Sequence, residues 1–190
     1  APAAMCIFMG KNHIVEIANQ HMLNLMGQTE SSVLNKPIFE GIPEAKGQGF
    51  EKLLDNVFNT GESFVANEFP VTLPRNGIVE PVYINFVFES LKDRDGKIIG
   101  IVAIAIDVSS QVLERKKMED SERKFRTLAD NMSQLAWLAD ENGARYWFNQ
   151  RWYDYTGTSL ENMKNSGWQV VHHPEHVDRV IKGLKNSIKT

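Results

Sequence analysis

The sequence predicts an α+β fold: two strands, a belt of helices and a three-stranded meander, then a linker helix and the first half of a second, similar module. Three observations predict it. Two β-rich regions enclose a helical one, an apolar stripe marks one amphipathic helix, and a pattern around Asn19 and Gly27 recurs around Asn149 and Gly157. We therefore divide the chain into residues 1–109, 110–132 and 133–190.

The first two strands are expected at residues 5–9 and 13–18, joined by a hairpin turn over residues 10–12. A short helix follows from Asn19 to Gly27, because glycine suits the left-handed position that ends many helices. Residues 31–36 form a second short helix, which Pro37 ends because proline disfavours a helical conformation in the residue before it.

A longer amphipathic helix is predicted from Phe50 to Thr60, ending at Gly61. Apolar residues fall on one face of this helix at the spacing i, i+3, i+4, i+7 and i+8. They are Phe50, Leu53, Leu54, Val57 and Phe58.

Three strands follow at residues 64–73, 80–91 and 97–108, separated by the turn sequences Asn76-Gly77 and Asp95-Gly96. The last strand is apolar on both faces, whereas an antiparallel sheet usually leaves one face in water. We therefore expect both faces to be covered. The helices cover one face, and either the following helix or a second subunit covers the other.

The connector, residues 108–132, is charged and contains no glycine or proline. Met118, Phe125 and Met132 recur every seven residues, which indicates a coiled-coil tendency. Polar residues weaken it at the other heptad positions, which a coiled coil fills with apolar side chains. The alternative is a solvated linker helix that packs on one domain.

The second module is expected to repeat the opening: strands at 134–139 and 144–148, a helix from Asn149 and another after Pro174. So small a half-module should bury its large aromatic side chains poorly. We expect residues 133–190 to pack on a neighbour, exchange with another chain or order poorly. The aromatic residues concerned are Trp137, Trp147, Trp152, Tyr155 and Trp168.

Composition narrows the class of protein. The 190 residues are 42% hydrophobic and 24% charged with a net charge of −3, so no basic excess predicts nucleic acid binding. No apolar run is long enough to span a bilayer, and the first residues lack the basic region of a signal peptide. A lone Cys6 excludes a disulfide framework and a thiolate zinc site. We expect a cytoplasmic piece of a longer protein, without membrane contact.

Sequence signals for catalysis are absent: the chain has no phosphate-binding glycine loop, nucleophile elbow or catalytic triad, and no phosphoacceptor or ATP-binding motif. We therefore predict no catalytic residues and no enzyme activity for this fragment. His172, His173 and His176 could suggest a metal site, but Pro174 interrupts their helical spacing. A polar helix start is the better interpretation, and no metal is predicted.

Several motifs in this order resemble the PAS domain family. E-I-A-N-Q and Y-W-F-N-Q-R-W-Y-D-Y-T-G are similar to its passage from the second strand into the first helix. S-L-K-D-R-D-G-K-I-I-G-I-V-A-I-A-I-D-V-S resembles its final hairpin. E-D-S-E-R-K-F-R-T-L-A-D-N-M is similar to connectors between PAS units, and V-V-H-H-P-E-H to one subgroup's His-Pro-acidic element. The resemblance implies a PAS fold, a five-stranded antiparallel sheet with a helical belt, followed by a linker helix and a truncated second PAS domain. It also implies a sensory or relay module of a bacterial two-component sensor histidine kinase.

Some members of the PAS family bind a flavin or a haem through particular residues, and these residues can be looked for in this sequence. Flavin-binding photosensory members use a cysteine on a helix, but Cys6 lies on the first strand. Haem-binding members use a histidine on the long helix, yet residues 50–60 contain none. His21 is interpreted as an ordinary, partly buried side chain. We predict no cofactor; an unidentified small ligand stays possible.

The resemblance places any ligand between the helices and the sheet. Candidate lining residues are Phe50, Leu54 and Phe58 on the long helix, with Tyr83 and Asn85 on one face of a strand. The alternative is that the apolar stripe fills a core and that Tyr83 and Asn85 face outward.

Signal coupling is predicted at Asp107 and Ser109, where the last strand passes into the connector. Ser109 or Ser110 would cap the helix and Asp107 would hold the strand end. The leading hypothesis is therefore a signal relay that forms a homodimer through the outer sheet face or the connector. The alternatives are a small-molecule sensor and a protein-docking domain.

Overall fold

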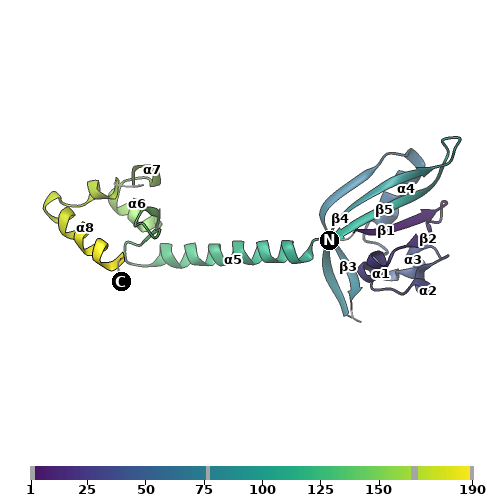
Figure 1. Cartoon of the computed structure of the whole chain (residues 1–190), viewed down its shortest axis with the longest axis horizontal. Coiled ribbons are helices and arrows are strands. Elements are labelled where there is room, and N and C mark those ends of the chain that lie inside the picture. The colour runs from purple at the N-terminus through teal and green to yellow at the C-terminus, as the bar shows by residue number, and fades with distance from the viewer. Residues whose placement is uncertain (1–2, 76–77, 164–166, 189–190) are drawn as a thin grey trace. The chain divides into compact units, whose positions relative to one another are not determined.

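The computed structural model describes residues 3–75, 78–163 and 167–188. It divides into two compact units, Ala1–Lys116 and Lys117–Thr190, so that the division falls within helix α5 (Ser109–Asn131) rather than at its ends (Figure 1). The predicted turn at Asn76-Gly77 lies outside the described residues.

The first unit contains a five-stranded antiparallel sheet in the order β2-β1-β5-β4-β3. Because β1 pairs with both β2 and β5, the two early strands and the three late ones form one sheet, as the sequence predicts. The strands are β1 (Ala4–Met9), β2 (Ile14–Ala18), β3 (Phe64–Arg75), β4 (Ile78–Lys92) and β5 (Ile98–Asp107).

Helix α1 (Gln20–Met26) begins and ends where the sequence predicts. The Asn19 side-chain oxygen accepts hydrogen bonds from the backbone N–H of Met22 at 2.9 Å and of Met5 at 3.0 Å, so one residue caps the helix and ties it to β1. Gly27 ends the helix with φ 62°, and a Cβ there would lie 1.8 Å from the Pro74 carbonyl oxygen. Only glycine fits this position.

The helical belt continues through α2 (Glu30–Val33), α3 (Ile38–Gly41), the 3-10 helix η1 (Pro43–Ala45) and α4 (Phe50–Thr60). The second predicted helix is shorter than expected, and α3 was not predicted. A four-residue helix presents too little sequence to show a period. Pro37 precedes α3 as its N-cap, so the residue that ends one helical region also begins the next.

The core of the first unit lies between this belt and one face of the sheet. Helix α1 packs on β1 and β3, and α4 packs on β4 and β5. From α4, Leu54 and Val57 are fully buried. Along strand β4, buried and more exposed side chains alternate, because every second side chain points toward the core. Its buried residues are Val82, Ile84, Phe86 and Phe88.

The outer face of the sheet carries an apolar row. Met5, Ile104, Val87 and Val65 are register partners across β1, β5, β4 and β3, so they form a line across the sheet. Met5 is 45% exposed and Val65 is 64% exposed. Within Ala1–Lys116 the described residues therefore cover the inner face more completely than the outer one. The covering of the outer face stays a prediction.

Helix α5 begins at Ser109, two residues after the end of β5, and runs through the region predicted as the connector (Figure 1). Its surface is mostly charged, and Arg126 donates to Glu122 across one turn at 2.6 Å. Among the described residues, no helix is both long and apolar enough to cross a membrane.

In the second unit, α5 is followed by a hairpin of β6 (Trp137–Ala139) and β7 (Arg145–Phe148). Helices follow along the chain, and all four tryptophans of the protein lie in this unit. The helices are α6 (Gln150–Thr156), α7 (Leu160–Met163), the 3-10 helix η2 (Gly167–Val171) and α8 (Pro174–Ile188).

The expectation that this unit buries its aromatic residues poorly is wrong for Trp152 and Trp168, which are 6% and 5% exposed. They form a small core with Phe148 and Met163, because β7, α6, α7 and η2 enclose a space of their own. Tyr155, at 79% exposed, follows the expectation.

Candidate functional site

The junction between β5 and α5 is held to strand β4 through Tyr83. The Val108 N–H donates to the Tyr83 carbonyl at 2.9 Å. The Tyr83 N–H donates to the Ser109 hydroxyl oxygen at 2.9 Å. Both predicted coupling residues therefore lie at the junction, and Ser109 turns toward the sheet.

Asp107 supplies the cap that the sequence analysis assigned to a serine. Its side-chain oxygen accepts the Ser109 N–H at 2.8 Å and so satisfies one of the backbone donors that a helix start leaves unpaired. The Ser110 hydroxyl instead donates to Gln111 at 3.0 Å. The serine-cap prediction is wrong because the Ser109 hydroxyl is already engaged with β4.

A bulge in β3 brings a second connection to α5. Between the pairs Ala66–Phe86 and Phe69–Ile84, two residues of β3 oppose the single residue Asn85. One of them, Glu68, has a positive φ of 51°, and its N–H donates to the Asn85 side-chain oxygen at 2.7 Å. The bulge re-aims the Glu68 side chain, as such insertions commonly do.

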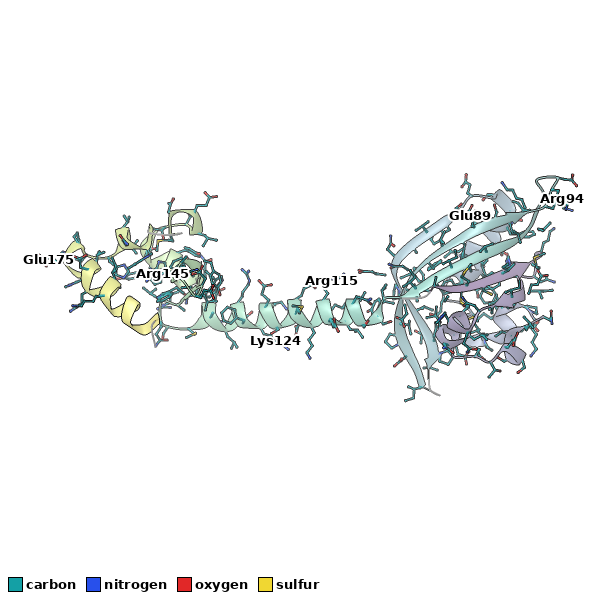
Figure 2. All side chains as sticks on the ribbon, viewed as in Figure 1. Glu89, Arg94, Arg115, Lys124, Arg145 and Glu175 are labelled. Atoms are coloured by element: carbon teal, nitrogen blue, oxygen red, sulfur yellow. The ribbon has the colours of Figure 1, made fainter. Side chains whose placement is uncertain are left out.

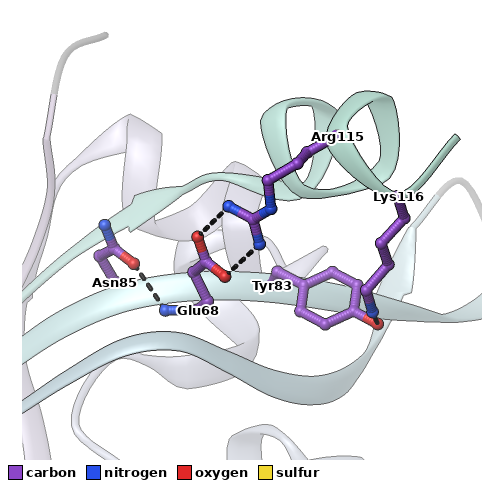
Figure 3. Close-up of polar contacts among 5 residues, drawn as sticks. All are labelled: Glu68, Tyr83, Asn85, Arg115 and Lys116. Atoms are coloured by element: carbon purple, nitrogen blue, oxygen red, sulfur yellow. Dashed lines mark hydrogen bonds and ion pairs between the residues drawn. The ribbon is translucent and has the colours of Figure 1, made fainter. Parts of the chain in front are cut away.

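Glu68 then binds α5. Its two carboxylate oxygens accept from the two terminal nitrogens of Arg115 at 2.7 and 2.6 Å, which is a bidentate pair (Figure 3). Beside it, the Lys116 amine donates to the Tyr83 hydroxyl at 2.7 Å. We call Glu68, Tyr83, Asn85, Arg115 and Lys116 the polar clasp.

The clasp consists of charged and polar side chains at the protein surface. The hydrogen bond from Arg115 is the main reason that the pKa of Glu68 lies below its ordinary value, and the charges of Arg115 and Lys116 act in the same direction. The side chains of Arg115 and Glu68 are 50% and 43% exposed, so solvent screens the pair. The clasp therefore fixes a position more than it adds stability.

An apolar cavity of about 90 Å³ lies between the belt and the sheet. Phe50 and Leu54 line it as predicted. Phe58 does not, because its ring packs at 6.1 Å from the ring of His13. The lining side chains are Phe8, Met22, Leu25, Met26, Ile38, Phe39, Ile42, Ala45, Phe50, Leu54, Val71, Leu73, Ile84, Phe86, Phe88, Ala103 and Ala105.

Tyr83 and Asn85 are not pocket residues; they face outward, as the alternative interpretation of the sequence predicts. They do not line the cavity, because Ile84 and Phe86, their neighbours on β4, point into it and alternate residues point away. They lie instead on the outer face, where they belong to the polar clasp (Figure 3).

The cavity does not fit the cofactors considered from the sequence. No cysteine or histidine is among the residues that line it. Its volume of about 90 Å³ is also well below the ~300–1,000 Å³ that is usual for ligand pockets. Cys6 is buried on β1, and burial raises the pKa of its thiol to about 12, so it is not a thiolate at neutral pH. His21 is exposed on α1 rather than partly buried.

The histidines of the second unit have protein partners. The His172 ring nitrogen Nδ1 lies 2.9 Å from the Trp168 carbonyl, and His173 lies 4.0 Å from Glu175. Within the described part of the chain, no group of three or more potential ligands is placed to hold a metal ion.

Sequence reasoning missed Glu68, Arg115 and Lys116. Glu68 lies 47 residues before its partner Arg115, so no local spacing connects them. Nothing at residue 68 signals a bulge, because the position of positive φ is not occupied by glycine. The only sequence signal is the pair of polar residues, Tyr83 and Asn85, on one face of an otherwise apolar strand.

Comparison with known proteins identifies the fold. The family profile described as "PAS domain" matches residues 2–110, which is more than half of the chain. The chain belongs to the PAS domain family. In this PAS domain the polar clasp and the cavity lie on opposite faces of the shared sheet.

Individual relatives are distant. The uncharacterized protein y4lL of Sinorhizobium fredii (strain NBRC 101917 / NGR234) is 29% identical over 90 residues, which are 46% of this chain and 11% of that protein. This chain therefore spans about a tenth of that relative's length.

One solved structure supports the same fold, and another is similar over part of its length. An RNA-binding Light-Oxygen-Voltage receptor matches with a TM-score of 0.50 at 14% identity, over 65% of this chain and 34% of that one. The structure described as VqmA bound to DPO matches with a TM-score of 0.47 at 22% identity, over 56% and 52% of the two chains.

Proposed function

We propose that this chain is a non-catalytic PAS relay module in which the start of α5 reports the packing of the sheet. The observation that carries the proposal is the double hydrogen bond between Tyr83 and the junction residues Val108 and Ser109. Strand β4 faces the core through Ile84 and Phe86, so a change in core packing that moves β4 also moves the start of the helix.

The clasp extends this link by about two helical turns. Arg115 and Lys116 follow Ser109 by six and seven residues, and both bind side chains that β3 and β4 present. The helix start is therefore held at the junction and again at the clasp. Two attachments define the direction of a helix where one would leave it free to pivot, and a signalling element needs such a defined pair of states.

We further propose that the second unit is the opening half of another PAS domain in a cytoplasmic two-component sensor histidine kinase. The offset of the elements supports the half-domain: α6 and α7 lie 130 residues after α1 and α2. Asn149 and Gly157 occupy the N-cap and C-cap positions of α6, as Asn19 and Gly27 do for α1, although only Asn19 caps its helix with a side-chain hydrogen bond. The kinase context rests on the sequence of the connector alone.

The strand register refines this repeat. Ile7 pairs with Ile17, whereas Leu138 pairs with Trp147, so the first strands of the two units correspond at an offset of 131 rather than 130. The first strand of the second unit therefore lies one residue closer to its partner strand, because the second hairpin turn is one residue shorter.

The relay proposal is tested by a double-mutant cycle on the whole chain. Ile84→Val loosens the core face of β4, and Ser109→Ala removes the hydroxyl that β4 binds. Amide hydrogen exchange over residues 109–116 is the readout. Ile84→Val should speed exchange there by about fivefold, as expected for roughly 1 kcal/mol of lost packing and local stability.

In the Ser109→Ala background the same core change should have less effect on residues 109–116, because one of the two hydrogen bonds between Tyr83 and the junction is already lost. Ser110→Ala is the matched control, since its hydroxyl contacts only Gln111. Equal effects of Ile84→Val in the Ser109→Ala and Ser110→Ala backgrounds would contradict the relay.

A small-molecule sensor is the second candidate function, and the cavity favours it. Because all the side chains that line it are apolar, the cavity would accept a compact apolar molecule and no charged one. Native mass spectrometry of the purified chain should then show a co-purifying mass that an apolar competitor displaces. If the chain carries no such mass and binds neither xenon nor benzene, the sensor function is refuted and the relay is the remaining candidate.

A further inference from the structure

A second site is indicated in the other unit, around Arg145 on strand β7. This residue is 5% exposed, although arginine is rarely buried without a partner. Arg145 is labelled among the side chains of the second unit in Figure 2. Its guanidinium carbon lies 3.6 Å from the ring centre of Trp168 and 4.4 Å from that of Trp137. Strand β6 and helix η2 thus supply the two rings that contact the cation.

These ring contacts leave the donors of the guanidinium unused. An arginine carries five N–H groups in the plane of the guanidinium, whereas an aromatic ring attracts it through the face. The buried Nε of Arg145 has no acceptor, and within the described part of the chain the guanidinium has neither a hydrogen bond nor an ion pair. Burial lowers the pKa of Arg145, and no nearby carboxylate opposes the shift.

A second buried donor nearby is also unpaired. The indole Nε1 of Trp152 has no acceptor, and the residue is 6% exposed. The rings of Trp152 and Trp168 both neighbour the ring of His172, at 6.5 and 5.1 Å. One aromatic cluster therefore contains two buried groups that lack partners, and both are donors.

Unpaired donors around a buried positive charge define the chemistry of the missing partner. A water molecule could accept one N–H but would leave the charge of Arg145 uncompensated. A planar oxyanion offers two acceptors and a negative charge, which match the fork of a guanidinium.

We propose that the second unit binds a small molecule through a carboxylate or phosphate group, held in the plane of the Arg145 guanidinium between β7 and η2. Trp137 and Trp168 contact the faces of the cation, so a partner for its N–H groups approaches at its edge, in the plane of the guanidinium.

The test uses the whole chain labelled with ¹⁵N and follows the Arg145 Nε–H signal by NMR. Potassium phosphate and sodium acetate are added separately, each against potassium chloride at the same ionic strength. We expect a saturable downfield shift with phosphate or acetate and none with chloride. Whichever of the two binds more tightly identifies the ligand as a phosphate or a carboxylate.

A variant pair supplies the control. Arg145→Gln should raise the dissociation constant of the preferred anion at least about tenfold, measured by tryptophan fluorescence, because charge-assisted hydrogen bonds are lost. Arg151→Gln, an exposed position on α6, should leave it unchanged. A response of the wild-type signal that is linear in salt and equal for all three anions would overturn the proposal, whether or not the Arg145 variant folds.

Discussion

Leu54 gives the sharpest test of how the first unit is packed. It is 2% exposed, points from α4 into the core, and lines the apolar cavity of about 90 Å³. Leu54→Ala removes three carbon atoms, which at ~0.8 kcal/mol each amounts to about 2.4 kcal/mol of lost burial. The enlarged cavity adds to this loss, because neighbours relax only partly. We expect a total cost of about 3–4 kcal/mol.

The assay must report on the first unit alone, because a chain with two units need not unfold in one step. The slowest-exchanging amides of β1 and β5 provide this, since they open only when the sheet opens. Leu128→Ala is the matched control: Leu128 is 71% exposed on α5, and its loss should cost less than about 0.5 kcal/mol. A cost below about 1 kcal/mol for Leu54→Ala would show that α4 does not pack as described.

Two further predictions concern the surface. Arg115 lowers the pKa of Glu68, so the Glu68–Arg115 ion pair stabilises the folded state fully above the ordinary carboxyl pKa of 4.5. This stabilisation is lost as the pH falls through the lowered pKa of Glu68. A ¹³C NMR titration of the carboxyl group should place the Glu68 midpoint below 4.5. Arg115→Gln should raise this midpoint, whereas the control Arg126→Gln should not. Equal Glu68 midpoints in the wild type and in Arg115→Gln would contradict the clasp. The apolar row should promote self-association: light scattering should detect a dimer that Val65→Glu weakens, whereas a concentrated wild-type monomer would refute this.

The sequence predicts the fold of the first unit because its signals are local. Asn19 and Gly27 mark the ends of a helix through their own backbone chemistry, and the stripe from Phe50 to Phe58 needs only the period of a helix. Helix α3 was missed since four residues cannot show a period. The paired strands followed from the turn residues between them.

The site was less predictable because it depends on which face of a strand points inward. Alternation shows that Tyr83 and Asn85 share a face, but both faces of β4 hold apolar residues nearby and the sequence does not say which one the helices cover. The partners Glu68 and Arg115 meet only through a bulge and a chain reversal. Neither event has a signature in the residues themselves.

The placement of all four tryptophans after residue 131 gives the second unit an optical signal of its own. Light at the red edge of protein absorption excites indole alone, so its emission reports the second unit without interference from the first. Tyrosine offers no such separation, because Tyr83 lies in the first unit and Tyr146, Tyr153 and Tyr155 lie in the second. Melting of the second unit can thus be followed by its own emission, with no dye and no engineered probe.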